Sequence, residues 1–242
     1  MRFRDSRKKR SGTPNEGAIS SNFKPITENQ NRAYQAYRAG KNPLLTGYAG
    51  TGKTYLACAF ALESLQRGDV ATIRLIRSAV PSRDIGFLPG TEAEKLAVYE
   101  KPYESVFTAL TGRGDTYQIL KQKRQLVFES SSFLRGMTYD ANFIIVDEFQ
   151  NMSFQELNTI ITRFGVGTRA AICGDIHQTD LATSRSGFSK LNAIIDLMPR
   201  WFTIINMTSD DIVRSPLVKD YLMALDKLNE EQKHDLPHER RS

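Results

Sequence analysis

The chain has 242 residues, of which 40% are hydrophobic and 25% are charged, which is enough for one sizeable globular core. No apolar run reaches the roughly 18 residues that a membrane span needs, and the N-terminus lacks the apolar segment of a secretory signal. This excludes a transmembrane protein, and we expect a soluble protein of the cytoplasm. Cys58 and Cys173 lie in apolar surroundings, which favours buried thiols over a disulfide.

The positive charge is concentrated at the N-terminus. Of a net charge of +6, nearly all lies in residues 1–10, which contain six basic residues and one acidic residue. Residues 11–21 are rich in Gly, Pro, Asn and Ser. We therefore expect residues 1–22 to form a flexible basic leader. This leader either contacts nucleic-acid phosphates or is a solvated terminus without that role.

Predicted helices and strands alternate along the rest of the chain. In chain order, we expect a helix capped by Thr27, a strand at 43–46, a helix at 53–66, a strand at 70–76, a loop at 77–90, a helix at 92–110, strands at 125–129 and 143–146, a helix capped by Ser153, a strand at 170–173, a helix at 188–197, a strand at 202–207 and a helix at 216–228. This alternation predicts an α/β fold with a parallel sheet, helices on both faces, and ligands at the carboxyl ends of the strands. The single domain should span residues 23–228, before a flexible tail at 229–242.

A complete phosphate-binding loop follows the first predicted strand. Its pattern, G-x-x-x-x-G-K-T, comprises Gly47, Tyr48, Ala49, Gly50, Thr51, Gly52, Lys53 and Thr54. Glycines let backbone N–H groups approach a phosphate chain at the N-terminus of the following helix. The lysine adds positive charge for the outer phosphates, and the threonine hydroxyl is a ligand for Mg²⁺. The loop therefore predicts binding of ATP together with Mg²⁺.

Two adjacent acids end the apolar strand at 143–146. We expect Asp147 to hold the Mg²⁺ shell and Glu148 to orient or deprotonate an attacking water. Successive side chains of a strand point in opposite directions, so the chain must turn after Asp147 if both acids are to face one site. This pair extends the prediction from ATP binding to ATP hydrolysis.

Five further side chains are candidates for the site. Gln178, which follows the strand at 170–173, suits a sensor of the terminal phosphate. Gln30 either contacts the adenine edge or caps its helix, and Arg77 either binds nucleic-acid phosphate or is structural. Hydrolysis also needs a positive group near the transferred phosphate. Arg214 is our first candidate and Arg163 its rival, with the arginine supplied by a neighbouring subunit.

Several of these motifs match a known family. From about Phe23 to Tyr221 the chain resembles the PhoH-like proteins, which are P-loop ATPases related to the RecA-like domain of superfamily 1 helicases. The matching segments are Gly86-Phe87-Leu88-Pro89-Gly90, Glu94-Lys95, Tyr99 to Tyr103, Asp147-Glu148-Phe149-Gln150-Asn151, Gly174-Asp175, Gln178 to Leu181 and Asp211-Ile212-Val213-Arg214. The resemblance implies a RecA-like fold, ATP hydrolysis, a homo-oligomeric ring such as a hexamer, and helicase-like activity on RNA. The basic leader and Tyr48 are similar to phage-encoded forms, whose location would be the host cytoplasm.

Three functions compete for this sequence. The first is an ATPase coupled to RNA or single-stranded nucleic acid, with its sites completed between subunits. The second is a nucleotide-switched binding or scaffold protein with slow ATP turnover, which the nearly neutral body favours. The third is a small-molecule kinase, for which a water-activating Glu148 is unsuited. We expect the first.

Overall fold

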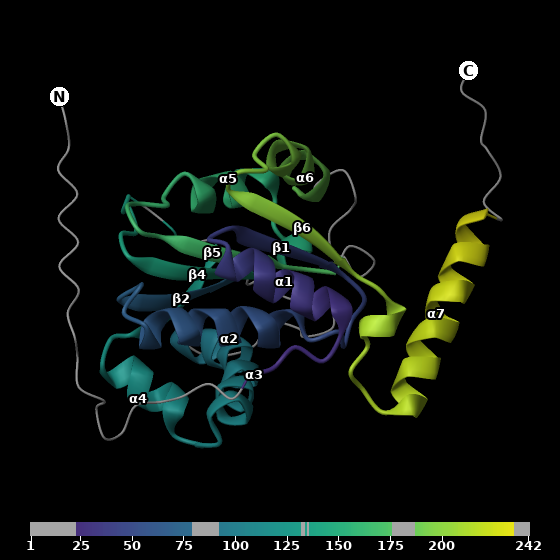
Figure 1. Ribbon diagram of the computed structural model, residues 1–242, viewed down its shortest axis with the longest axis horizontal. Helices are drawn as coiled ribbons and strands as arrows, with labels where there is room; N and C mark the ends of the chain where they lie inside the picture. The colour runs from purple at the N-terminus through teal and green to yellow at the C-terminus, as the bar shows by residue number, and fades with distance from the viewer. Residues whose placement is uncertain (1–22, 79–91, 132–133, 135, 176–186, 235–242) are drawn as a thin grey trace.

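A parallel sheet forms the centre of the molecule (Figure 1). The computed structural model describes residues 23–78, 92–131, 134, 136–175 and 187–234. Within these residues, six parallel strands form one sheet in the order β3-β2-β4-β5-β1-β6. The strands are β1 (Asn42–Gly47), β2 (Thr72–Arg77), β3 (Leu126–Ser130), β4 (Asn142–Asp147), β5 (Arg169–Cys173) and β6 (Phe202–Met207). The predicted parallel sheet is therefore confirmed.

Helices cover both faces of this sheet (Figure 1). One face carries α1 (Glu28–Arg38), α2 (Lys53–Gln66), α3 (Glu92–Thr111) and α4 (Thr116–Gln122), and the other carries α5 (Phe154–Ile161) and α6 (Phe188–Asp196). Two short 3₁₀ helices, η2 (Phe149–Asn151) and η3 (Ser209–Asp211), follow β4 and β6, and α7 (Pro216–His234) extends away from the sheet. Among the described residues, no helix is both long and apolar enough to cross a membrane.

Alternation along the strands divides the core into two layers. In β4, Phe143 and Ile145 pack beneath the α1–α4 layer, whereas Ile144 and Val146 pack beneath α5 and α6. Every residue of β4 is buried, as expected for a parallel strand covered on both faces. The two packed faces hold the carboxyl ends of β1 and β4 in fixed positions, and the loops of the candidate site begin there.

The predicted elements agree with the structure in order and type, and the differences are the additional helix α4 and the later end of α7. The helix α4 was not expected, because its seven residues are too few for a clear helical pattern. Pro102 lies within α3 without ending it, since packing of the buried residues around it outweighs one lost backbone hydrogen bond. The last helix continues to His234, beyond its predicted end at residue 228.

Candidate nucleotide-binding site

The phosphate loop connects β1 to α2 and has the backbone shape that its glycines predict. Gly47, Gly50 and Gly52 all have positive φ angles, of 109°, 75° and 84°. A side chain at Gly47 would place its Cβ 1.9 Å from the carbonyl oxygen of Met207, so only glycine fits there. The helix α2 begins directly after the loop, at Lys53, and its first N–H groups form an anion-binding end.

Lys53 lies across this loop. Its Nζ donates to the carbonyl oxygens of Gly47 and Tyr48 at 2.7 and 2.6 Å. Thr51 closes the loop from within, because its hydroxyl donates to the carbonyl of Tyr48 at 2.9 Å. Burial lowers the pKa of Lys53, and the nearby acids oppose this shift. The ammonium is therefore held at the centre of the loop.

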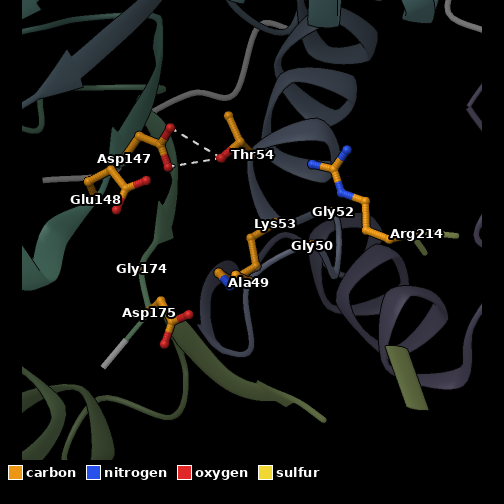
Figure 2. A pocket seen from close by; sticks show the side chains of 10 residues that line it. All are labelled: Ala49, Gly50, Gly52, Lys53, Thr54, Asp147, Glu148, Gly174, Asp175 and Arg214. Atoms are coloured by element: carbon orange, nitrogen blue, oxygen red, sulfur yellow. Dashed lines mark hydrogen bonds between the residues drawn. The ribbon is translucent and has the colours of Figure 1, made fainter. Parts of the chain in front are cut away.

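Thr54 and Asp147 meet at the edge of the loop, as the two motifs predict. The hydroxyl of Thr54 donates to Oδ1 and Oδ2 of Asp147 at 3.0 and 3.1 Å (Figure 2). Burial raises the pKa of Asp147, and the charge of Glu148 adds to this effect. A hydroxyl and a carboxylate suit Mg²⁺, which takes one or two protein oxygens and completes its shell with water and phosphate. The residues present therefore fit this metal.

The chain turns after Asp147 and brings Glu148 to the same cavity. Glu148 has a φ of 55°, in the left-handed region that non-glycine residues rarely adopt. The amide of Gln150 then joins two loops, because its Nε2 donates to Glu148 and its Oε1 accepts from the backbone N–H of Asp175 at 3.0 Å. A Cβ at Gly174 would lie 2.4 Å from the ring of Phe149, so this junction requires glycine.

These groups surround one cavity of about 250 Å³. Its lining consists of Ala49, Gly50, Gly52, Lys53, Thr54, Asp147, Glu148, Gly174, Asp175 and Arg214 (Figure 2). The acids come from the carboxyl ends of β4 and β5, and the cations come from α2 and from the segment before α7. Carboxylates, a lysine, an arginine and loop N–H groups thus face the same small volume, as a bound phosphate chain with a metal ion requires.

Arg214 lies beside the phosphate loop of its own chain (Figure 2). A Cβ built on Gly50 would be 2.9 Å from the Cγ of Arg214, and the backbone N–H of Val213 donates to the carbonyl of Gly50 at 3.0 Å. This arrangement favours a role for Arg214 in the site of its own subunit over the expected role in the site of a neighbouring subunit.

The rival candidate, Arg163, lies elsewhere. It follows α5, its Nε donates to the carbonyl of Thr159 at 3.2 Å, and its own carbonyl accepts from Tyr139, which precedes β4. This is the amino-terminal edge of the sheet, so Arg163 does not line the cavity of its own chain. Gln178 lies outside the described residues.

Gln30 contacts the phosphate loop and is buried. Its Nε2 donates to the carbonyl of Thr51 at 3.2 Å, and its Oε1 accepts from the backbone N–H of Ile26 at 3.0 Å. The cap of α1 is made by Thr27, whose hydroxyl accepts from the backbone N–H of Gln30. The Gln30 side chain therefore joins the start of α1 to the loop and is not the cap.

A larger and mostly apolar cavity of about 820 Å³ adjoins the loop on the α1, α2 and α3 side. It is lined by Phe23, Lys24, Ile26, Gln30, Gly50, Gly52, Tyr55, Pro102, Ser105, Val106, Ala109, Val213 and Arg214. An apolar volume next to a phosphate-binding loop can hold a flat aromatic ring. Apart from Gln30, Arg214 and the loop glycines, this lining was not expected, because it gathers single side chains from distant segments.

Two other residues, Tyr103 and Arg77, lie beside Asp147, and only the structure shows this proximity. Tyr103 on α3 donates from its hydroxyl to Oδ2 of Asp147 at 2.7 Å. Arg77 pairs in register with Asp147 on the adjacent strand, and its guanidinium lies 5.6 Å from the centre of the Tyr99 ring. These contacts favour the structural role among the two considered for Arg77. Nothing in the spacing of Tyr103 indicated its contact with Asp147.

Comparison with known proteins gives consistent results. A family model described as PhoH-like protein matches residues 22–226. The chain is 36% identical over 219 residues to a PhoH-like protein of Mycobacterium leprae, covering 88% of this chain and 60% of the relative. It is 32% identical over 183 residues to Protein PhoH of Escherichia coli K12, covering 74% and 51%. The chain therefore spans only about half to three-fifths of the length of these relatives.

A comparison of structures adds a more distant similarity. The crystal structure of Pif1 helicase from Candida albicans aligns with 77% of this chain and 40% of that chain, with 15% sequence identity and a TM-score of 0.38.

Proposed function

Because the chain belongs to the PhoH-like protein family and so to the P-loop NTPases, we propose that it binds ATP with Mg²⁺ and hydrolyses it. The contact between Thr54 and Asp147 at the phosphate loop is the observation that carries this proposal. It joins the two halves of a nucleotide site that lie 93 residues apart in the chain. Glu148 in the same cavity supports hydrolysis in addition to binding.

The main functional side chains of the cavity each have a role in this proposal. Loop N–H groups and Lys53 bind the β- and γ-phosphates, and Thr54 with Asp147 hold Mg²⁺, which would neutralise charge on the outer phosphates. Glu148 orients and deprotonates the attacking water. Arg214 offsets the charge that develops on the transferred phosphoryl group, and Gln178 keeps its proposed role as a sensor of that group.

The larger cavity is proposed to hold the adenine ring. Phe23, Tyr55 and Val106 give it apolar walls next to the loop. The amide of Gln30 uses one N–H and one lone pair for its bonds to Thr51 and Ile26. An amide has a second N–H and a second lone pair, which match the N7 acceptor and the N6 donor of adenine.

We further propose that hydrolysis is coupled to RNA or single-stranded DNA, in the cytoplasm and within a homo-oligomeric ring such as a hexamer. The resemblance of the motifs to those of helicase-related ATPases supports the coupling. A second function, a nucleotide-switched binding protein, is favoured by α7. This helix follows Arg214 and carries exposed apolar side chains, including Leu217, Tyr221 and Leu228.

An ATPase assay on a sample of known oligomeric state tests both proposals. We expect Mg²⁺-dependent turnover that RNA or single-stranded DNA raises several-fold, and no turnover in Lys53→Ala. Turnover that neither polynucleotide changes would reject the coupling and favour the switched binding protein. Absence of Mg²⁺-dependent turnover in the wild-type protein would reject ATP hydrolysis itself.

A further inference from the structure

A second hydroxyl group reaches Asp147 besides that of Thr54. Tyr103 is 1% exposed, and its Oη is 2.7 Å from Oδ2 of Asp147. Thr54 approaches the same carboxylate from the phosphate loop. The two donors come from different helices, α3 and α2, so together they restrict the rotation of the carboxylate about its χ angles. Hydrogen bonds to a charged group are stronger than those between neutral groups, and a buried carboxylate depends on them.

Tyr103 is itself held in place by the packing of α3. Tyr103, Phe107 and Leu110 form one buried stripe of this helix in the core beneath it. The Tyr103 ring also lies 5.7 Å, centre to centre, from that of Phe128 on β3. Pro102 and Val106, on a neighbouring face of the same helix, line the larger cavity. The hydroxyl therefore approaches Asp147 from a rigid support.

We propose that Tyr103 is a positioning residue for the metal site, whose hydrogen bond to Oδ2 fixes the Asp147 carboxylate beside Thr54, where these two residues would hold Mg²⁺. This inference rests on the proposed function, because it concerns the same site. Removing a residue that hydrogen-bonds to a metal-ligating carboxylate, without itself contacting the metal, commonly lowers metal affinity by about 10–100-fold. This role also explains one residue of the segment Tyr99 to Tyr103, to which the phosphate loop and the acidic pair assign no function.

Metal-dependent nucleotide binding by Tyr103→Phe tests this role without using catalysis as its readout. A fluorescent ADP analogue is kept at fixed concentration while Mg²⁺ is titrated, for the wild-type protein and for the variant. We expect the Mg²⁺ concentration at half-maximal binding to rise about 10–100-fold in Tyr103→Phe. Binding of the analogue in EDTA should change by less than about threefold, because the phosphate loop is unaltered.

Tyr117→Phe is the matched control. Tyr117 is also 1% exposed, and its hydroxyl donates to a carboxylate, that of Glu100, at 2.8 Å, but Glu100 lies outside the site. This variant should retain the wild-type Mg²⁺ dependence. Thermal unfolding of each variant shows whether the fold is retained. If Tyr103→Phe does not fold, Tyr103→Met replaces it, because the flexible methionine side chain fills irregular core volumes.

The possible outcomes separate this inference from the proposed function. A folded hydroxyl-free variant with the wild-type Mg²⁺ dependence would overturn the positioning role. An equal shift in Tyr117→Phe would also overturn it, since the effect would then reflect general loosening of the α3–α4 layer. A wild-type protein that binds no nucleotide at any Mg²⁺ concentration would instead reject the proposed function.

Discussion

At the scale of one residue, the backbone conformation of Glu148 places its carboxylate in the site. A left-handed conformation costs a non-glycine residue roughly 1–2 kcal/mol, and such positions persist where surrounding structure imposes them. Here the bond from Gln150 and the buried Asp147 on the preceding position hold the turn. The conformation directs two adjacent acids to one cavity, which a continuing strand could not do.

We predict that Glu148→Gln retains nucleotide binding and loses hydrolysis. Glutamine has nearly the same shape but cannot accept a proton from water, so kcat should fall by about 10²–10⁴-fold. The dissociation constant of the Mg²⁺-bound ATP analogue should stay within a few-fold of the wild-type value. Steady-state turnover and equilibrium binding measure the two quantities. Glu104→Gln, outside the cavity, serves as the control, and normal turnover in Glu148→Gln would refute the assigned role.

At the scale of elements, one carboxylate joins α1 to the segment that carries Arg214. Asp211 is 2% exposed and accepts hydrogen bonds from Thr27 and Asn29 at the start of α1, and from the backbone N–H of Thr208. Burial alone would raise the pKa of Asp211, but the bonds from Asn29, Thr27 and Thr208 outweigh it, and the pKa is lowered. The ionised form therefore stabilises this junction.

We predict that Asp211→Asn destabilises the protein in a pH-dependent way. Loss of the charged acceptor should cost about 1–3 kcal/mol in free energy of unfolding at pH 7. Because the pKa is lower in the folded state, this contribution is present above the ordinary aspartate pKa of about 3.9 and is lost as the pH falls through the folded-state pKa. Urea unfolding at pH 7 and below pH 4 measures the difference between the two proteins.

Asp210→Asn is the control for this prediction, because Asp210 is the exposed neighbour in η3. It should leave stability nearly unchanged at both pH values. A stability loss in Asp211→Asn that is the same at neutral and acid pH would show that the charge is not its source.

At the scale of the whole molecule, the position of Arg214 bears on assembly. The residue lines the cavity of its own chain and packs against Gly50, so one subunit supplies every charged residue proposed for the site. The ring that the resemblance implies stays a prediction, and the structure favours a site that does not depend on an arginine from a neighbouring subunit.

Mixing two inactive variants tests this reading. Lys53→Ala lacks the phosphate-binding lysine, and Arg214→Ala should lose about 10³–10⁵-fold in turnover if the arginine acts on the transition state. When both variants are mixed, we expect no recovery, because no subunit then contains both groups. A mixture of wild type with Lys53→Ala in the same ratio is the control. Recovered turnover would instead support sites that are completed between subunits.

The sequence by itself determined the α/β architecture and the chemical core of the site. Periodicity predicted the alternating elements, and the local pattern from Gly47 to Thr54 predicted the loop, because its backbone shape depends on glycines that lie within a few residues of one another. Asp147 and Glu148 were found in the same way, as adjacent acids that end an apolar strand. These features depend on residues that are close together in the sequence, so they can be predicted without knowledge of the tertiary structure.

Only the tertiary structure decided which distant side chains complete the site. The contact of Tyr103 with Asp147, the bridge from Gln150 to Asp175 and the packing of Arg214 against Gly50 each join separate segments. No periodicity or spacing encodes such contacts, because they depend on how helices pack on the sheet and on which strand ends lie side by side. The strand order β4-β5-β1 places the ends of these strands side by side, and this brings together residues that the sequence could identify only one at a time.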